Sequence, residues 1–289
     1  MKKPLFTGVC TALVTPFLNG EVNYPMLQIL LTRQIEAGVE AVVLSGTTGE
    51  SANLSDNEKI NLFRHAKEFV GDKMLIFAGT GSNDTRHAIS LSVAAQEAGA
   101  DGLLVVSPYY NKATADGLIA HYTAIANAVS IPIIVYNVPS RTGVDIPVSV
   151  YKHLSQMPNI AGVKEASTDI GKILRIRAEC TDTFSLWSGN DHLTVPILSL
   201  GGKGVISVIS NLFPEQMNLM TYAALDGDFD TAAALQCQML PWTDFLGSEV
   251  NPIPIKAAMA HFGFDCGECR LPLTSLSSVN QSTLEKLSS

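Results

Sequence analysis

The chain has 289 residues, of which 46% are hydrophobic and 16% charged, a composition that fits one large globular α/β domain or one with a modest appendage. Its formal net charge of -8 and the lack of any Lys/Arg run argue against a nucleic-acid partner, so we expect small molecules and other subunits as partners. The N-terminal residues lack the apolar core of a signal peptide, and no apolar run is long enough to span a bilayer. We therefore expect no membrane partner and a cytoplasmic location.

Short apolar segments alternate with amphipathic ones along most of the chain. We interpret eight apolar segments as strands: 6–14, 41–44, 74–78, 102–106, 131–136, 160–166, 184–187 and 204–208. Helical patterns lie between them at 24–37, 55–70, 84–98, 114–128, 147–154 and 170–179. Ser55 and Glu58 have the spacing of a capping box at the start of the second helix. Beyond Pro214 the pattern is only helical, at 215–225, 229–245, 254–261 and 281–287.

This alternation of strand and helix is typical of βαβ units, and eight such units indicate a closed (β/α)8 TIM barrel. We expect the barrel, with a catalytic lysine, to occupy residues 1–225. A C-terminal helical appendage is expected at 226–289, packed beside the barrel.

Five scattered cysteines do not form the pattern of a disulfide framework. Cys266 and Cys269 are the one close pair, but a zinc site needs two further ligands and only His261 lies nearby. We expect reduced thiols and no metal at this pair.

The sixth strand ends in a lysine, Lys164. Alternation places Ile160, Gly162 and Lys164 on one face of this strand. A lysine that faces into a closed barrel is desolvated, which disfavours its charged form, and a neutral amine can attack a carbonyl to form a Schiff base. Taken alone, the segment favours a lysine that extends from a strand end into solvent, because such lysines are common and reactive ones are rare.

The predicted carboxyl ends of the strands bring further polar residues to the same rim. These are Thr47, Thr48, Tyr109, Tyr110, Tyr136, Arg141, Gly189 and Asn190. Hydroxyl groups suit a carboxylate and a moving proton, a guanidinium suits a second carboxylate, and a lysine suits a ketone. Each residue singly has an ordinary explanation as a strand end or a surface charge, but their joint placement predicts an active site. The six histidines do not gather on that rim, which disfavours metal-assisted aldol chemistry.

Five motifs resemble those of the dihydrodipicolinate synthase family, the 4-hydroxy-tetrahydrodipicolinate synthases of lysine biosynthesis. They are Gly-Thr-Thr-Gly-Glu at 46–50, Pro-Tyr-Tyr-Asn at 108–111, Tyr-Asn-Val-Pro-Ser-Arg-Thr-Gly at 136–143, Val-Lys-Glu-Ala at 163–166 and Asn-Pro-Ile-Pro-Ile-Lys at 251–256. The similarity extends over nearly the whole chain, with the motifs in family order and at family spacing.

The resemblance implies a lyase that condenses pyruvate with L-aspartate 4-semialdehyde to give 4-hydroxy-tetrahydrodipicolinate, in lysine and diaminopimelate biosynthesis, with no metal and no external cofactor. Lys164 would form the imine with pyruvate, and Thr48 would hold the pyruvate carboxylate. Tyr136 would carry protons to and from the imine and enamine. Thr47 and Tyr110 would complete a hydroxyl relay, Tyr110 coming from a neighbouring subunit.

For the second substrate, the resemblance implies that Arg141 binds the carboxylate of the semialdehyde. Gly189 and Ile206 would shape the pocket through their backbone carbonyls. Asn190 stands where many family members carry an acid that orients the semialdehyde, so that contact is expected to differ. The implied assembly is a homotetramer built as a dimer of dimers.

Two alternatives remain open at this level. N-acetylneuraminate lyase and other class I pyruvate aldolases share the lysine and the tyrosine, but Arg141 suits a short dicarboxylate precursor better than a polyhydroxylated sugar. The second alternative is a barrel that binds a keto acid as a sensor and does not catalyse its conversion.

The resemblance also has implications for inhibition by lysine. The positions of the family's lysine-effector site carry Asp56, Lys59 and His87, and the glutamate that would meet the ammonium group of the effector is missing. Lysine inhibition is therefore expected to be weak or absent.

Overall fold

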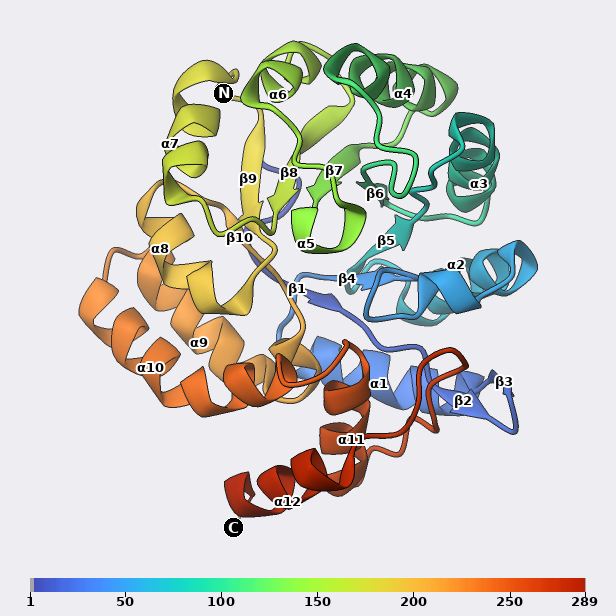
Figure 1. The fold of residues 1–289 in the computed structure, drawn as a ribbon, viewed down its shortest axis with the longest axis vertical. Coiled ribbons are helices and arrows are strands. Elements are labelled where there is room, and N and C mark those ends of the chain that lie inside the picture. Colours follow the sequence, from blue (N-terminus) through green and yellow to red (C-terminus); the bar gives the residue numbers. More distant parts are fainter. Residues whose placement is uncertain (1–2, 289) are drawn as a thin grey trace.

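Eight parallel strands form a closed barrel in the computed structural model, which describes residues 3–288 (Figure 1). The strands follow one another around the barrel in chain order, and the last one closes against the first. They are β1 (Gly8–Ala12), β4 (Ala41–Leu44), β5 (Leu75–Gly79), β6 (Gly102–Val106), β7 (Ile133–Asn137), β8 (Ile160–Glu165), β9 (Ser185–Ser188) and β10 (Gly204–Ser207). The predicted TIM barrel is confirmed.

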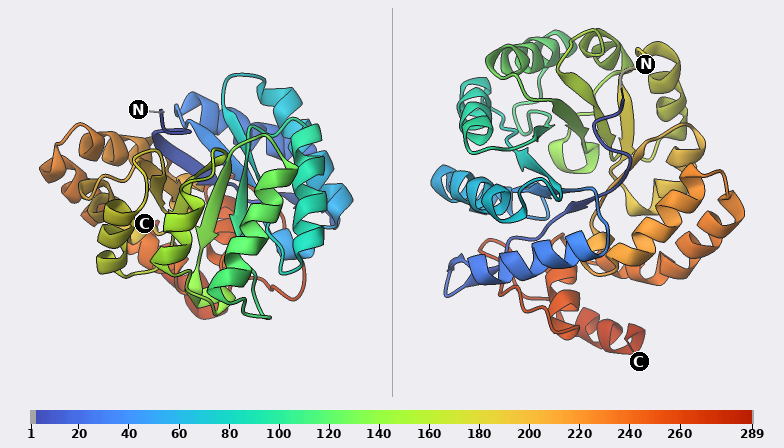
Figure 2. Two further views of the ribbon diagram at one scale, coloured as in Figure 1. Left: turned by 90° about the horizontal axis from the view of Figure 1, so that it is seen from above. Right: turned by 180° about the vertical axis from the view of Figure 1, so that it is seen from behind.

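A ring of helices surrounds the barrel, as the view from behind also shows (Figure 2). It consists of α1 (Tyr24–Glu36), α2 (Asp56–Val70), α3 (Thr85–Glu97), α4 (Ala115–Ala128), α6 (Val148–Leu154), α7 (Ile170–Glu179), α8 (Thr194–Ser199) and α9 (Pro214–Leu225). The predicted capping box is present at the start of α2, where Ser55 accepts a hydrogen bond from the backbone of Glu58 and the Glu58 side chain accepts one from the backbone of Ser55.

Several short elements were not predicted from the sequence patterns. The two strands of a small hairpin, β2 (Phe17–Leu18) and β3 (Glu21–Val22), and the one-turn helix α5 (Pro139–Thr142) are too short to show a period. Helix α8 has only six residues, too few to show a helical period, and contains Pro196. Three 3₁₀ turns, η1 (Ser51–Asn53), η2 (Asp191–Leu193) and η3 (Ile209–Asn211), follow strand ends.

Two apolar layers stabilise the barrel. The outer layer fills the space between the strands and the helices. The inner layer fills the barrel itself and includes Cys10, Phe77, Ile134, Trp187 and Ile206. The barrel is therefore a packed core, and ligands have room only at its ends.

A register shift in β8 alters the alternation predicted for the lysine strand. Ile133 pairs with Ile160 and Ile134 with Gly162, so Ala161 is an additional residue in the strand. Ile160 consequently packs in the outer layer with Val163, whereas Ala161 contacts the inner layer. The prediction that Ile160 shares a face with Lys164 was wrong, although Lys164 does face inward.

Three helices follow the barrel: α10 (Phe229–Leu246), α11 (Ile253–His261) and α12 (Ser278–Leu287). Helix α10 packs on α8 and α9, while α12 lies outside the ring of barrel helices in Figures 1 and 2. Arg270, in the segment between α11 and α12, forms an ion pair with Glu58 of α2 at 2.5 Å. No helix within residues 3–288 is both long and apolar enough to cross a membrane.

Candidate active site

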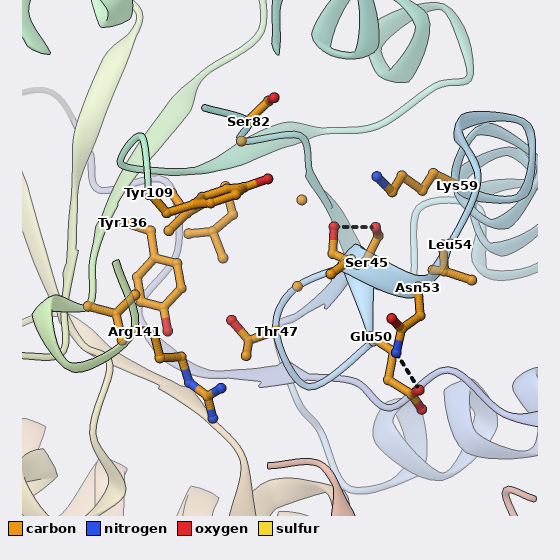
Figure 3. Close-up of a pocket in the computed structure, with 18 of the residues that line it drawn as sticks. Ser45, Thr47, Glu50, Asn53, Leu54, Lys59, Ser82, Tyr109, Tyr136 and Arg141 are labelled. Carbon is orange, nitrogen blue, oxygen red and sulfur yellow. Dashed lines mark hydrogen bonds between the residues drawn. The ribbon is translucent and has the colours of Figure 1, made fainter. Parts of the chain in front are cut away.

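A cavity of about 770 Å³ opens where the strands end, which is the size of a typical small-molecule site (Figure 3). Its walls come from the segments after β4, β5, β6 and β7 and from the C-terminal region. The predicted site residues that line it are Thr47, Tyr109, Tyr136 and Arg141. Residues from three separate parts of the sequence therefore meet at one opening.

Lys164 lies beside this cavity without lining it. The residue is only 4% exposed and sits on β8 between Tyr136 of β7 and Trp187 of β9. The Lys164 Nζ atom lies 4.4 Å from the centre of the Tyr136 ring. Because Tyr136 also lines the cavity, it contacts both Lys164 and the space that a ligand would occupy.

Gly189 provides the space beside the lysine side chain. A Cβ atom at this position would lie 3.0 Å from Lys164 Cγ and 2.8 Å from Ala166 Cβ. Any larger residue would therefore press on the stem of Lys164, which explains in steric terms why a glycine follows β9.

The segment after β4 carries both predicted threonines in a constrained loop. Ser45 and Glu50 have φ of 54°, in the left-handed region that side chains other than glycine rarely adopt. Thr47 is partly exposed to the cavity, whereas Thr48 is 2% exposed. The Thr48 Oγ1 atom accepts a hydrogen bond of 2.9 Å from Asn251 Nδ2.

The C-terminal region also holds this loop through a buried ion pair. Lys256 Nζ lies 2.7 Å from Glu50 Oε1, and the two side chains are 4% and 0% exposed. The second oxygen of Glu50 accepts a hydrogen bond of 2.9 Å from the Arg270 backbone N–H. Helix α11 and the segment after it are therefore part of the support for Thr47 and Thr48.

Arg141 is exposed on the short helix α5 and lines the cavity. Figure 3 shows its guanidinium group extending below Tyr136 on the side of Thr47. Within residues 3–288 the guanidinium has no hydrogen-bond or ion-pair partner, so it is available to an anionic ligand.

Tyr110 is a predicted site residue whose side chain lies away from the cavity. Its side chain is 90% exposed and does not line the cavity, and its φ of 69° is also in the left-handed region. The neighbouring Tyr109, which is 40% exposed, lines the cavity instead.

Asn190 and Ile206 lie at the ends of β9 and β10. Asn190 Oδ1 accepts a hydrogen bond of 3.1 Å from the His192 backbone and so caps the turn η2. Ile206 is 1% exposed in the inner layer of the barrel. Neither side chain lines the cavity.

The other end of the cavity carries Asp56, Lys59, Ser82 and His87. Asp56 lies 3.8 Å from Lys59 Nζ and 2.9 Å from His87 Nε2, and Ser82 lies 3.1 Å from His87 Nδ1. Burial lowers the pKa of Lys59, although Asp56 opposes this shift. This end therefore presents a cation that is already paired with a carboxylate.

None of the five cysteines lines the cavity. All five are free, and Cys266 is buried, which raises the pKa of its thiol to about 12. Within residues 3–288, His, Cys, Asp and Glu side chains do not gather in any group of three that could hold a metal ion.

Asn251 is the functional candidate that sequence reasoning missed. It belongs to a motif that the sequence does reveal, but it lies 203 positions from Thr48, and no local pattern links the two.

Together the groups of the site offer a buried amine beside a phenol, a hydroxyl held by an amide, and an unpaired guanidinium. Such a set suits the binding of a keto acid and a second anion, with proton transfer between them.

Comparison with known proteins gives one consistent result. The model of the dihydrodipicolinate synthetase family matches residues 5–289. The 4-hydroxy-tetrahydrodipicolinate synthase of Acetivibrio thermocellus is 42% identical over 287 residues, which cover 99% of this chain and 97% of the relative.

Solved structures agree with this result. The dihydrodipicolinate synthase of Aquifex aeolicus is 41% identical with a TM-score of 0.96, and the match covers 98% of this chain and 97% of the other. The enzyme of Cyanidioschyzon merolae with lysine bound is 40% identical with a TM-score of 0.95, at the same coverage of both chains.

Proposed function

The chain belongs to the dihydrodipicolinate synthetase family, and on that basis we propose that it condenses pyruvate with L-aspartate 4-semialdehyde to give 4-hydroxy-tetrahydrodipicolinate. It is a lyase of lysine and diaminopimelate biosynthesis, and it works through a lysine–pyruvate Schiff base without an external cofactor. The observation that carries this proposal is the buried Lys164 amine 4.4 Å from the ring of Tyr136, beside a cavity that also holds Arg141.

Lys164 begins the reaction. Its neutral amine attacks C2 of pyruvate, and loss of water from the resulting carbinolamine gives a protonated imine. Removal of a proton from C3 then gives an enamine, whose C3 attacks the aldehyde carbon of the semialdehyde. Attack of the semialdehyde amine on C2 closes the ring and frees Lys164, so one water is released per product.

Tyr136 moves the protons in these steps. Its phenol is at the cavity wall and its ring contacts the lysine, which supports this role. Thr47 lines the same cavity and passes protons to Tyr136 as part of a hydroxyl relay.

Tyr110 completes the relay in a neighbouring subunit. A tyrosine that is 90% exposed and has a left-handed backbone costs free energy, and contact with a partner subunit offsets that cost. This supports an oligomer of at least two chains, and we propose a homotetramer formed from two dimers.

Thr48 holds the pyruvate carboxylate. Because the Thr48 oxygen accepts its hydrogen bond from Asn251, the hydroxyl proton remains free to point at a carboxylate. Gly189 and Ile206 shape the pocket around the imine through their carbonyl groups, at the ends of β9 and β10.

Arg141 binds the carboxylate of the semialdehyde, supported by its position in the cavity and its lack of any partner in the described chain. Asn190 orients the same substrate as a hydrogen-bonding amide. The relatives reported above bear the synthase name, so the N-acetylneuraminate lyase alternative gains no support.

Other features complete the proposal. Five free thiols suit the reducing cytoplasm. Residues 226–289 act as an appendage of the barrel at 1–225 that supports the Thr47–Thr48 loop, rather than as an independent domain. Lysine inhibits weakly or not at all, because Asp56, the carboxylate at the Lys59 end of the cavity, is already paired with Lys59 and His87 and is not free to bind the ammonium group of a lysine effector.

A turnover assay tests the function. The purified protein, given pyruvate with L-aspartate 4-semialdehyde, is expected to form a product that dihydrodipicolinate reductase consumes with NADPH. Cleavage of N-acetylneuraminate under the same conditions, without the first activity, would assign the chain to the aldolase alternative.

A further inference from the structure

A buried polar network lies on the outer side of the barrel, between the segment that carries Arg141 and the strand that carries Lys164. Its members, which we call the Glu165 network, are Asn137, Asp145, Tyr151, Glu165 and Lys172. Neither the cavity nor the reaction described above uses these side chains, yet four of the five are at most 5% exposed.

Glu165 is the centre of the network. It follows Lys164 directly and is fully buried. Its Oε1 accepts hydrogen bonds from Asn137 Nδ2 at 2.7 Å and from the Ser167 backbone at 2.9 Å. Its Oε2 accepts one from the Tyr151 hydroxyl at 3.0 Å and lies 3.4 Å from Lys172 Nζ. With four donors around it, this carboxylate has one well-defined orientation.

Asn137 closes the loop that carries Arg141. This loop runs from 138 to 145, between the end of β7 and the approach to α6. Asn137 Nδ2 donates to Asp145 Oδ1 at 2.8 Å, and Asn137 Oδ1 accepts from the Ile146 backbone at 3.1 Å. One side chain at the start of the loop therefore holds its far end in place, and the same side chain binds Glu165.

Lys172 joins the two carboxylates from α7. The lysine is 5% exposed, and its Nζ contacts both Asp145 and Glu165. Without this cation, two carboxylates would share Asn137 with no balancing charge. Tyr151 adds a neutral donor, because its burial and then the nearby Glu165 raise the pKa of its phenol well above the usual value.

We propose that Asn137, Glu165 and Lys172 are positioning residues that set the distance between the Arg141 guanidinium and the Lys164 imine. The network fixes the loop at its base and ties it to the residue after Lys164, so it determines where the second substrate lies relative to the enamine. This inference rests on the proposed function. It predicts a selective effect on the semialdehyde, because pyruvate is held by Lys164 and by Thr48 on a different loop.

Lys172→Met tests the inference, since it removes the cation and keeps an apolar stem of similar length. We expect the KM for the semialdehyde to rise about tenfold, equivalent to about 1.4 kcal/mol, while the KM for pyruvate and the rate of borohydride trapping change less than about twofold. Arg141→Ala serves as the reference for complete loss of the guanidinium.

Two further variants serve as controls. Lys172→Arg restores the cation and is expected to recover most of the affinity for the semialdehyde. Lys152→Met changes an exposed lysine on the adjacent helix α6 and is expected to leave both KM values unchanged.

Asp145→Asn provides a second route if Lys172→Met does not fold. The Asp145 side chain is 53% exposed, so its replacement leaves the core intact, and we expect the same selective rise to a smaller extent. Equal rises in both KM values, or a lower Tm with both KM values unchanged, would overturn the positioning role. If instead the parent protein neither traps pyruvate nor forms product, the proposed function is what fails.

Discussion

The buried ion pair between Glu50 and Lys256 links the C-terminal region to the Thr47–Thr48 loop, and Lys256→Met tests that link. The Lys256 ammonium lies 2.7 Å from Glu50 Oε1, and both side chains are almost inaccessible to solvent. Removal of the lysine leaves a buried carboxylate oxygen without its charged partner, which typically costs about 3–5 kcal/mol. The second oxygen keeps its hydrogen bond from the Arg270 backbone, so the loop is weakened rather than released.

Thermal unfolding measures the effect. At roughly 2–4 °C per kcal/mol for a chain of this kind, we expect the Tm to fall by about 10 °C. The kcat with saturating substrates is expected to fall as well, because Thr47 and Thr48 lose part of their support. The Glu50→Gln/Lys256→Met double variant removes both charges and should recover much of the lost Tm.

Lys73→Met is the matched control, since Lys73 is exposed in the turn between α2 and β5. Its Tm should remain within about 1 °C of the parent, as for most surface substitutions. A Lys256→Met variant with the stability and kcat of the parent would refute the view that the C-terminal region supports the loop.

Three further predictions concern the relay, regulation and pH. Tyr110→Phe is expected to lower kcat by about 10²-fold with little change in the KM for pyruvate, and parent-like turnover would remove Tyr110 from the relay. Lysine is expected to inhibit, if at all, with a constant of about 1 mM or weaker, and inhibition at far lower concentrations in a steady-state assay would contradict this. Burial lowers the pKa of His121 to about 4, so the folded protein resists protonation there and stability should fall as the pH drops from about 6.5 towards 4. His121→Gln should flatten the Tm over that range, whereas the exposed His153→Gln should not.

The sequence reveals the barrel because its signals are local. The strand at 41–44 and the helix at 170–179 have the predicted bounds, and the capping box of Ser55 and Glu58 needs only neighbouring residues. The register shift at Ala161 is different, since it depends on pairing with β7 and leaves no mark on the apolar pattern.

The same distinction between local and long-range signals applies to the site. The sequence predicted Thr47, Tyr136, Arg141 and Lys164 at one end of the barrel, because the carboxyl ends of the strands meet there in any TIM barrel. The hydrogen bond from Asn251 to Thr48 joins residues that are 203 positions apart in the sequence, and it could not be derived from local patterns.

Borohydride reduction of the protein with pyruvate, followed by peptide mass spectrometry, tests the central claim most directly. We expect one pyruvyl adduct, located on Lys164, and its loss in Lys164→Arg, whose guanidinium stays protonated and does not form imines. The buried Lys172, whose ammonium contacts two carboxylates, provides an internal reference and should remain unmodified. An adduct on another lysine, or none at all in a folded protein, would contradict the assignment of Lys164 as the residue that forms the Schiff base.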